Sequence, residues 1–261
     1  MRWKLATSTV TGKAHTDRGE TGQDNNKAGT VRIGETEFFV GLAADGAGST
    51  TEGGRGAEIA CETIYQLIVA NLREAGDISA ITDMEIHAWI TAARDAIQGE
   101  ATAKGKRLKE YACTILGAVA GERSALFFQI GDGAMVTGSD GSTGSGREYH
   151  TIFWPEQGEY ANTTFFVTDE QYLDRLHILH AESSPDEIAL FTDGLQNLVL
   201  SFSQRQAHAG FFRPLFDALN KFPENAFSEF SAQLESFLGR DEVNARSDDD
   251  KTLVLAVRVQ D

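Results

Sequence analysis

Strand-like apolar runs follow one another along this chain with short polar gaps between them, and this grouping constrains the fold most. The runs around 111–121, 124–133 and 134–141 are separated by only a few residues. Parallel strands need a crossover of a dozen or more residues, so gaps this short require antiparallel pairing. Because the helical patterns also fall together between groups of strands, the sequence predicts an α+β fold with antiparallel sheets rather than an alternating βαβ fold.

Two long amphipathic helices are the clearest single elements. Apolar residues between Ala57 and Leu72 recur every three or four positions, which places them on one face of a helix. A second helix follows Thr82, whose spacing from Glu85 is that of a capping box, and its apolar stripe continues to Ile97. Further helices are expected at 195–203, 206–222 and 224–238, and further strands at 3–10, 30–44, 151–155, 163–169, 175–180, 187–194 and 251–259.

Composition limits the class of protein and its partners. The chain has 261 residues, 41% of them hydrophobic, and no linker, repeat or charge block divides it, so we expect one domain, 1–261. Its formal charge of −16 argues against nucleic acid or an anionic membrane as a partner. The first residues lack a signal-peptide core and no apolar stretch reaches membrane-spanning length, which predicts a cytoplasmic protein. Cys61 and Cys113 are expected to be small buried core residues rather than part of a disulfide framework or a zinc site.

Three apolar runs end on Asp-Gly, at Asp45, Asp132 and Asp193. Aspartate is unfavourable inside a strand, but at a strand end a rigid backbone holds it within reach of solvent or a metal. Several carboxylates gathered in this way form the oxygen-rich site that Mg²⁺ or Mn²⁺ prefers. Asp-Gly is also a common hairpin turn, and we interpret Asp132, in a tight segment between two strands, as such a turn. Asp193 stands between a strand and a helix, where no hairpin is needed.

Other acidic residues also stand next to expected strands. Asp24 lies near the end of a polar loop, and three consecutive aspartates, 248–250, precede the last strand. Repulsion among neighbouring carboxylates is costly unless a cation or solvent relieves it. These segments are therefore further candidates for metal binding.

These motifs, in this order, resemble the metal-dependent Ser/Thr protein phosphatases of type 2C. The resemblance is closest to the bacterial branch, which has "H…G…QD" near the start and "GEYANTT", here with Glu159 and Asn162, before the last third. It extends from His15 to the final strand. It implies two packed antiparallel β-sheets flanked by helix pairs, and two Mg²⁺ or Mn²⁺ ions as cofactors.

The resemblance also implies roles for individual residues. Asp45 would bridge the two metals, and the carbonyl of Gly46 would hold one of them. Asp193 and Asp249 would ligate the second metal, while Asp24 would act mostly through water. Asp45 and Asp193 are therefore the expected catalytic residues.

The implied reaction is hydrolysis of phosphoserine or phosphothreonine in proteins by a water activated between two metals. Arg18 and His15 are expected to contact the phosphate. The expected partner is a phosphorylated protein, the substrate of a bacterial Ser/Thr kinase. Two alternatives stay open: a catalytically weak or inactive phosphatase-like binding module in a kinase signalling system, and a two-metal hydrolase of nucleotides or other small phosphate esters.

Three positions depart from the family pattern. Arg18 lies six residues before Asp24, where the family usually has five. Ala47 stands where many members have a histidine, so water would have to protonate the leaving oxygen. Gln23 replaces one carboxylate of the usual acidic pair. These departures bear on efficiency and metal affinity more than on the fold.

Several other residues have a structural and a functional interpretation. His177 and His180 are three positions apart on an expected strand, so they should point to opposite faces. Arg55, near a helix start, could bind an anion or could simply be exposed. Asp169 could belong to a weaker third metal site. The Phe-rich segment 211–238 is expected to form core or a partner-docking surface.

Overall fold

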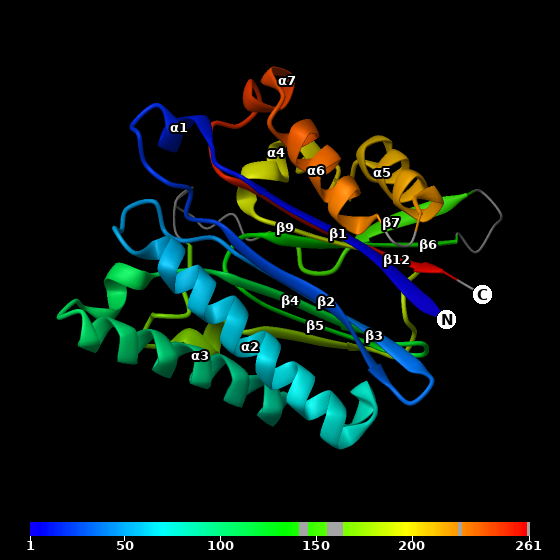
Figure 1. The fold of residues 1–261 in the computed structure, drawn as a ribbon, viewed down its shortest axis with the longest axis horizontal. Coiled ribbons are helices and arrows are strands. Elements are labelled where there is room, and N and C mark those ends of the chain that lie inside the picture. The colour runs from blue at the N-terminus through cyan, green and yellow to red at the C-terminus, as the bar shows by residue number, and fades with distance from the viewer. Residues whose placement is uncertain (141–145, 156–163, 224–225, 260–261) are drawn as a thin grey trace.

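Two five-stranded antiparallel sheets form the centre of the molecule (Figure 1). The computed structural model describes residues 1–140, 146–155, 164–223 and 226–259. Sheet 1 contains, in spatial order, β1 (Arg2–Val10), β12 (Lys251–Val259), β9 (Glu187–Phe191), β6 (Ala134–Asp140) and β7 (Arg147–Thr151). Sheet 2 contains β2 (Asn25–Ile33), β3 (Thr36–Ala44), β4 (Ile115–Ala120), β5 (Ala125–Ile130) and β8 (His177–Ala181).

Helices cover the outer face of each sheet, so the molecule has four layers (Figure 1). Helices α2 (Gly53–Ala75) and α3 (Asp83–Ala103) cover sheet 2. Helices α5 (Ala209–Lys221) and α6 (Phe227–Leu238) cover sheet 1. This arrangement confirms the predicted α+β fold of two packed antiparallel sheets flanked by helix pairs. The short elements are α1 (Lys13–Thr16), α4 (Gln196–Val199), α7 (Asp241–Asn244), β10 (Leu200–Ser201), β11 (Gln206–Ala207) and the 3₁₀ helices η1 (Ile78–Ala80), η2 (Leu108–Tyr111), η3 (Tyr172–Arg175) and η4 (Asp193–Leu195).

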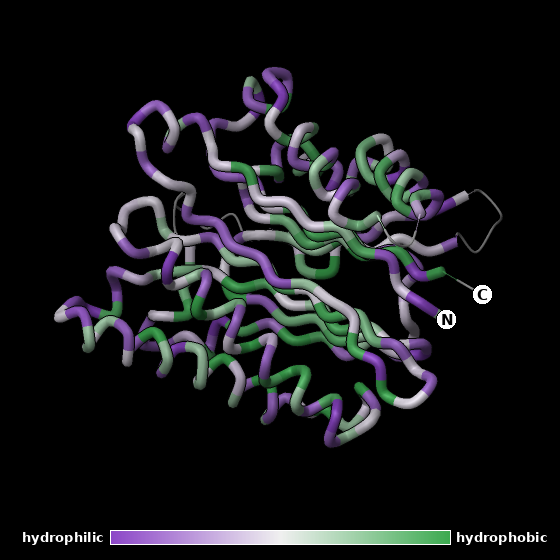
Figure 2. The backbone as a smooth tube through the Cα atoms, viewed as in Figure 1, coloured by the Kyte–Doolittle hydropathy of each residue, from purple (hydrophilic) through white to green (hydrophobic). Residues whose placement is uncertain are grey.

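The core explains why the central strands are apolar at every position. In β3, Val40 and Leu42 pack in the layer under α2 and α3, whereas Phe39 and Ala43 lie between the two sheets. A strand covered on both faces needs apolar residues on both, so strict alternation is lost. Figure 2 shows these apolar residues as a band of hydrophobic colour along the strands of both sheets.

The two long helices begin and end where the sequence indicates. At the start of α3, the backbone N–H of Thr82 donates to Glu85 Oε2 over 2.8 Å, half of the predicted capping box. Helix α2 ends at Ala75 and is followed by Gly76, whose φ of 74° is the left-handed conformation that glycine tolerates best. Cys61 and Cys113 are both buried in the core beneath these helices, as predicted. In the part of the chain that the structure describes, no helix has both the length and the apolar character needed to cross a membrane.

The strand expected at 151–155 is wrong, and so is the one expected at 163–169 over its described part, 164–169. Strand β7 ends at Thr151, and residues 164–169 form no strand. The chain here crosses from sheet 1 to sheet 2, so its aromatic residues pack against side chains of both layers instead of pairing. The ring centroid of Phe153 lies 5.6 Å from that of His177, and Trp154 lies 5.6 Å from Phe202.

The expected helix at 195–203 is mostly wrong as well. Only α4, Gln196–Val199, is α-helical there. The chain then forms the short strand β10, whose Leu200 and Ser201 pair with Ala207 and Gln206 of β11. The residues after Val199 therefore form a short hairpin where the sequence predicted further helix.

Candidate metal centre

Antiparallel pairing places Asp24 and Asp45 side by side at one end of sheet 2. Asp24 directly precedes β2 and Asp45 directly follows β3. Because Asn25 pairs with Ala44, the two aspartates must leave the sheet at the same end. The backbone N–H of Asp45 donates to Thr114 Oγ1 over 2.9 Å, which fixes the chain where β3 ends.

The same geometry brings Asp193 next to the aspartates before β12 in sheet 1. Phe191, the last residue of β9, pairs with Leu253 of β12, and Thr192 N–H donates to the carbonyl of Thr252 over 3.3 Å. Asp193 and Asp249 therefore occupy the same end of the sheet. The hydroxyl of Thr192 also donates to Asp24 Oδ2 over 2.7 Å, which joins the two sheets at this point.

Burial and mutual repulsion make these carboxylates reluctant to ionise. Burial raises the pKa of Asp24 to about 7, although the hydrogen bond from Thr192 opposes the rise. Burial, followed by the charges of Asp24 and Asp193, holds the pKa of Asp45 well above its usual range. Burial, followed by the charges of Asp132 and Asp249, raises the pKa of Asp193 to about 8.

The donor set fits a divalent cation. Within the described ranges, no lysine, arginine or histidine forms an ion pair with Asp24, Asp45 or Asp193. Oxygen ligands without a cationic partner are the chemistry that Mg²⁺ and Mn²⁺ select. No three Asp, Glu, His or Cys side chains of the described residues form a ready-made metal-binding group.

Two glycines allow the backbone around the site to pack tightly. A Cβ atom on Gly46 would lie 2.2 Å from the carbonyl carbon of Gly53, so only glycine lets the start of α2 sit against the end of β3. A Cβ atom on Gly194 would lie 1.9 Å from the carbonyl oxygen of Asp250, so only glycine lets η4 sit against the segment before β12. In both Asp-Gly motifs, therefore, the glycine is needed for a close backbone approach.

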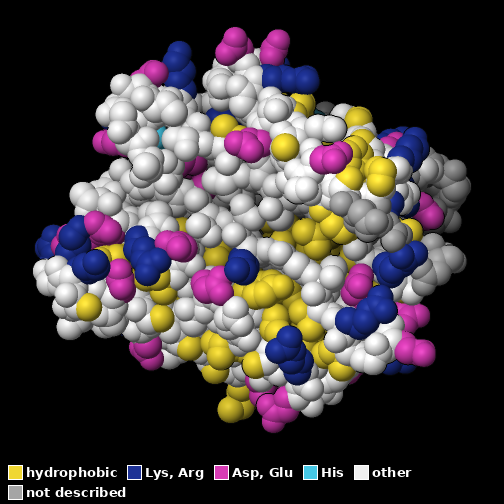
Figure 3. Space-filling model, viewed as in Figure 1, with side chains coloured by type: hydrophobic (Ala, Val, Ile, Leu, Met, Phe, Trp, Pro, Cys, Tyr) yellow, Lys and Arg dark blue, Asp and Glu magenta, His cyan; other side chains and the backbone are white. Residues whose placement is uncertain are grey.

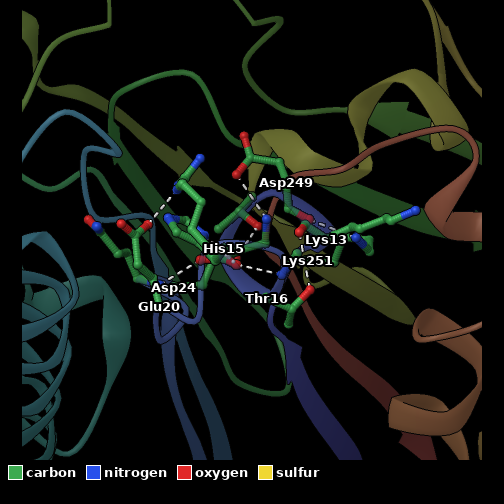
Figure 4. A network of polar contacts seen from close by, with 12 residues as sticks. Lys13, His15, Thr16, Glu20, Asp24, Asp249 and Lys251 are labelled. Atoms are coloured by element: carbon green, nitrogen blue, oxygen red, sulfur yellow. Dashed lines mark hydrogen bonds and ion pairs between the residues drawn. The ribbon is translucent and has the colours of Figure 1, made fainter.

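Asp250 was missed by the sequence analysis, although it organises the entry to the site. Its buried carboxylate accepts hydrogen bonds from the backbone N–H groups of Gly12 (2.6 Å) and Gln23 (2.5 Å), and its Oδ1 lies 3.0 Å from His15 Nδ1. Figure 4 shows the surroundings of this network, with Lys13, His15 and Thr16 of α1 close to Asp249 and Lys251. The sequence contains three successive aspartates at 248–250 and no signal that distinguishes the buried one from its exposed neighbours.

Asp132 was interpreted only as a turn residue, and the structure adds a second feature. It does lie in the bend between β5 and β6. Its charge also acts on Asp193, because Ala134 of β6 pairs with Phe191 at the end of β9. The signal that could have identified it is the one shared with Asp45 and Asp193, an apolar strand ending on Asp-Gly.

The expected phosphate-binding residues make contacts within the chain. His15 is 4% exposed, and its Nε2 is buried without a hydrogen-bond partner among the described residues. Arg18 is about half exposed and its Nε donates to Glu20 over 2.7 Å. The side-chain amide of Gln23 donates to the carbonyl of Thr50 over 3.2 Å, which ties the loop before β2 to the loop after Asp45.

The other candidate residues also make contacts within the chain. His180 pairs with Asp83 over 2.8 Å and Arg55 pairs with Glu58 over 2.7 Å, which favours their structural interpretation. Asp169 Oδ2 accepts the N–H of Phe166 within a local turn. In the Phe-rich helices α5 and α6, the fully or nearly fully buried rings form core, namely Phe212, Phe216 and Phe230. Glu159 and Asn162 lie outside the described residues.

Comparisons with known proteins agree with this geometry. The family model "Protein phosphatase 2C" matches residues 11–239. Serine/threonine-protein phosphatase 3 of Escherichia coli (strain K12) is 31% identical over 258 residues, which is 98% of this chain and 99% of that protein.

Solved structures of the same fold include two bacterial phosphatases. The catalytic domain of the serine threonine protein phosphatase PstP, in complex with two manganese ions, has a TM-score of 0.60 at 15% identity over 99% of each chain. The phosphatase Stp1 of Staphylococcus aureus has a TM-score of 0.58 at 15% identity, over 100% of this chain and 96% of that one. The predicted resemblance is confirmed, and the chain belongs to the protein phosphatase 2C family.

Proposed function

We propose that this chain hydrolyses phosphoserine and phosphothreonine in proteins with the help of two divalent metal ions. The observation that carries the proposal is that Asp24, Asp45 and Asp193 stand at strand ends of both sheets, have raised pKa values, and have no basic partner among the described residues. Such carboxylates are unfavourable unless protons or a cation relieve their repulsion. The name of the 31% identical relative and the manganese in the PstP structure support the same proposal.

The chain's own residues would hold the ions from both sheets. Asp45 would contact both ions, and the carbonyl of Gly46 would hold one of them. Asp193 and Asp249 would hold the second ion, and Asp24 would act mostly through water. Bound Mg²⁺ or Mn²⁺ would supply an activated water and neutralise the phosphate charge, which a protein of formal charge −16 otherwise repels. Thr192 would keep Asp24 oriented through its 2.7 Å hydrogen bond. Because Ala47 offers no proton, the leaving oxygen would take its proton from water.

The substrates would be phosphoproteins made by a Ser/Thr kinase. The assay is Mn²⁺-dependent phosphate release from a phosphothreonine peptide and from para-nitrophenyl phosphate, by the wild type and by Asp45→Asn and Asp193→Asn. Asp217→Asn, an exposed aspartate on α5, is the matched control. We expect activity that needs metal, is lost in the two site variants and is kept in the control. Full activity in either site variant would refute the assignment.

A second candidate is a phosphatase-like binding module without turnover. The observation in its favour is that the described carboxylates do not already form a group of three metal ligands. This candidate predicts that the wild type binds phosphopeptides but releases no phosphate at any Mn²⁺ concentration. Phosphate release from para-nitrophenyl phosphate alone, with phosphopeptides untouched, would instead favour a hydrolase of small phosphate esters.

A further inference from the structure

A groove lined by polar, charged and apolar residues begins two residues after Asp45 of the candidate metal centre. Its volume is about 550 Å³, and its lining includes Ala47, Thr50, Arg107, Lys109, Thr168 and Asp169. Ala47 is two residues from Asp45, and its N–H donates to the carbonyl of Ala112 over 2.8 Å. Ala47 and Ala112 both line the groove, so this part of its lining directly continues the loop that follows Asp45. A peptide with its phosphate at the metal centre would lay its neighbouring residues along this groove.

The groove borders the most basic segment of an acidic chain. Four of the 23 lysines and arginines fall within the six residues 104–109. In Figure 3, Lys and Arg side chains gather at the left edge of the molecule, near where Figure 1 shows α2 beginning and α3 ending. The whole protein has a formal charge of −16, so this local concentration of positive charge differs from the rest of the chain. The surrounding field repels anions, so a substrate anion would gain most from meeting this segment.

Among the described residues of this segment, Lys104 and Lys109 are the exposed lysines without an ion pair, and of these two Lys109 lines the groove. Lys106 already pairs with Glu52, and Arg107 pairs with Glu110 over 3.1 Å. Lys109 is exposed and forms no hydrogen bond or ion pair with the residues that the structure describes. Its ammonium group is therefore free to bind a carboxylate.

The groove lining also has an acidic part, which limits where that carboxylate could lie. Asp169 belongs to it, and its Oδ2 accepts the N–H of Phe166 over 2.8 Å, which fixes a negative charge there. An acidic ligand side chain would be repelled from the 166–169 part and attracted to the 107–110 part. The groove lining thus includes both a basic part and an acidic part.

We propose that this groove recognises an acidic residue flanking the phosphorylated residue of the substrate, and that Lys109 is the specificity-determining side chain. The proposal rests on the proposed function, since it assumes that phosphorylated protein segments are the substrates. To that function it adds a substrate class, phosphopeptides with an acidic residue next to the phosphorylated one. It also predicts that Lys109 has no effect on the hydrolysis of small phosphate esters.

The test compares two phosphothreonine peptides that differ only in having glutamates or glutamines on both sides of the phosphothreonine. Values of kcat/KM are measured for the wild type, Lys109→Gln and Lys109→Glu, with para-nitrophenyl phosphate as the substrate that cannot reach the groove. Lys221→Glu, the same charge change on an exposed residue of α5, is the matched control. Fluorescence anisotropy with the same peptides measures binding independently of turnover.

We expect the wild type to prefer the glutamate peptide, and Lys109→Gln to lose about two- to fivefold of that preference, the range of one exposed ion pair. Lys109→Glu should lose more, and the preference should weaken with added salt. The kcat/KM for para-nitrophenyl phosphate should be the same in the wild type and in both Lys109 variants. Lys221→Glu should keep the wild-type preference for the glutamate peptide. Equal kcat/KM for both peptides in the wild type, or equal losses in Lys109→Glu and Lys221→Glu, would overturn the inference and leave the phosphatase assignment standing.

Failure of the proposed function would look different. The wild type would then release no phosphate from any substrate. Peptide binding measured by fluorescence anisotropy would still test the inference: tighter binding of the glutamate peptide that is lost in Lys109→Glu supports it, and equal binding of both peptides overturns it. Loss of binding to phosphatidylserine vesicles or to single-stranded DNA in Lys109→Glu, with no change in peptide preference, would also overturn it.

Discussion

Replacing Asp250 with alanine should destabilise the protein strongly, because one buried carboxylate holds three donors. The backbone N–H groups of Gly12 and Gln23 lie 2.6 and 2.5 Å from its oxygens, and His15 Nδ1 lies 3.0 Å away. A buried donor left without a partner costs about 1–3 kcal/mol. Some of the three donors would find water after truncation, so we expect a loss of about 3–5 kcal/mol in the free energy of unfolding. Asp250→Asn keeps one acceptor oxygen and should lose about half as much.

Urea unfolding of the metal-free protein measures this directly. The midpoint should fall in the order wild type, Asp250→Asn, Asp250→Ala, with an unchanged dependence on urea concentration. Asp248→Ala is the matched control, since its side chain is exposed two positions away, and it should stay within about 0.5 kcal/mol of the wild type. If Asp250→Ala unfolded at the same urea concentration as Asp248→Ala, the hydrogen bonds of Asp250 would not stabilise the fold as argued.

Three further predictions follow from the same geometry. The pKa of Asp193 is raised from 3.8 to about 8 in the folded state, so the folded protein holds a proton that the unfolded chain releases, and the unfolding free energy of the metal-free protein should fall between about pH 4 and pH 8. Asp193→Asn should flatten this fall in urea midpoints measured with chelator, and an unchanged slope would contradict the assignment. Gly194→Ala should lose most of the metal-dependent phosphatase activity, because the new Cβ would lie 1.9 Å from the carbonyl oxygen of Asp250. Gly48→Ala is the control and should keep the activity, because the space around its Cβ is open. Equal activities of the two variants would argue against the close approach at Gly194. Gly99→Ala, exposed within α3 and also unobstructed, should stabilise the protein by about 0.5–1 kcal/mol in thermal unfolding, and a lower Tm would be the contrary result.

The strand ends were predictable because apolar runs stop on aspartate, and the pairing of those ends was not. Asp45 and Asp193 carry a local signal, an apolar strand followed by Asp-Gly. Their proximity depends on Asn25 pairing with Ala44, on Leu253 pairing with Phe191 and on the packing of the two sheets. No local pattern encodes such long-range register.

The errors lie where tertiary packing overrides local preference. The apolar residues around Phe153 and Trp154 are typical of a strand, yet they fill space between layers as the chain changes sheets. Asp250 is buried while Asp248 and Asp249 are exposed, although all three look alike in sequence. Burial of one residue in a run of identical neighbours depends on what packs over it, here Gly12, His15 and Gln23.

The central claim is that the strand ends of both sheets form one binuclear metal site, and calorimetric titration with Mn²⁺ tests it most directly. We predict two ions bound per wild-type chain and loss of both in Asp45→Asn, because Asp45 would be shared by the two ions. Asp217→Asn should bind as the wild type does. Absence of binding to the wild type at millimolar Mn²⁺, or two ions still bound by Asp45→Asn, would contradict the account.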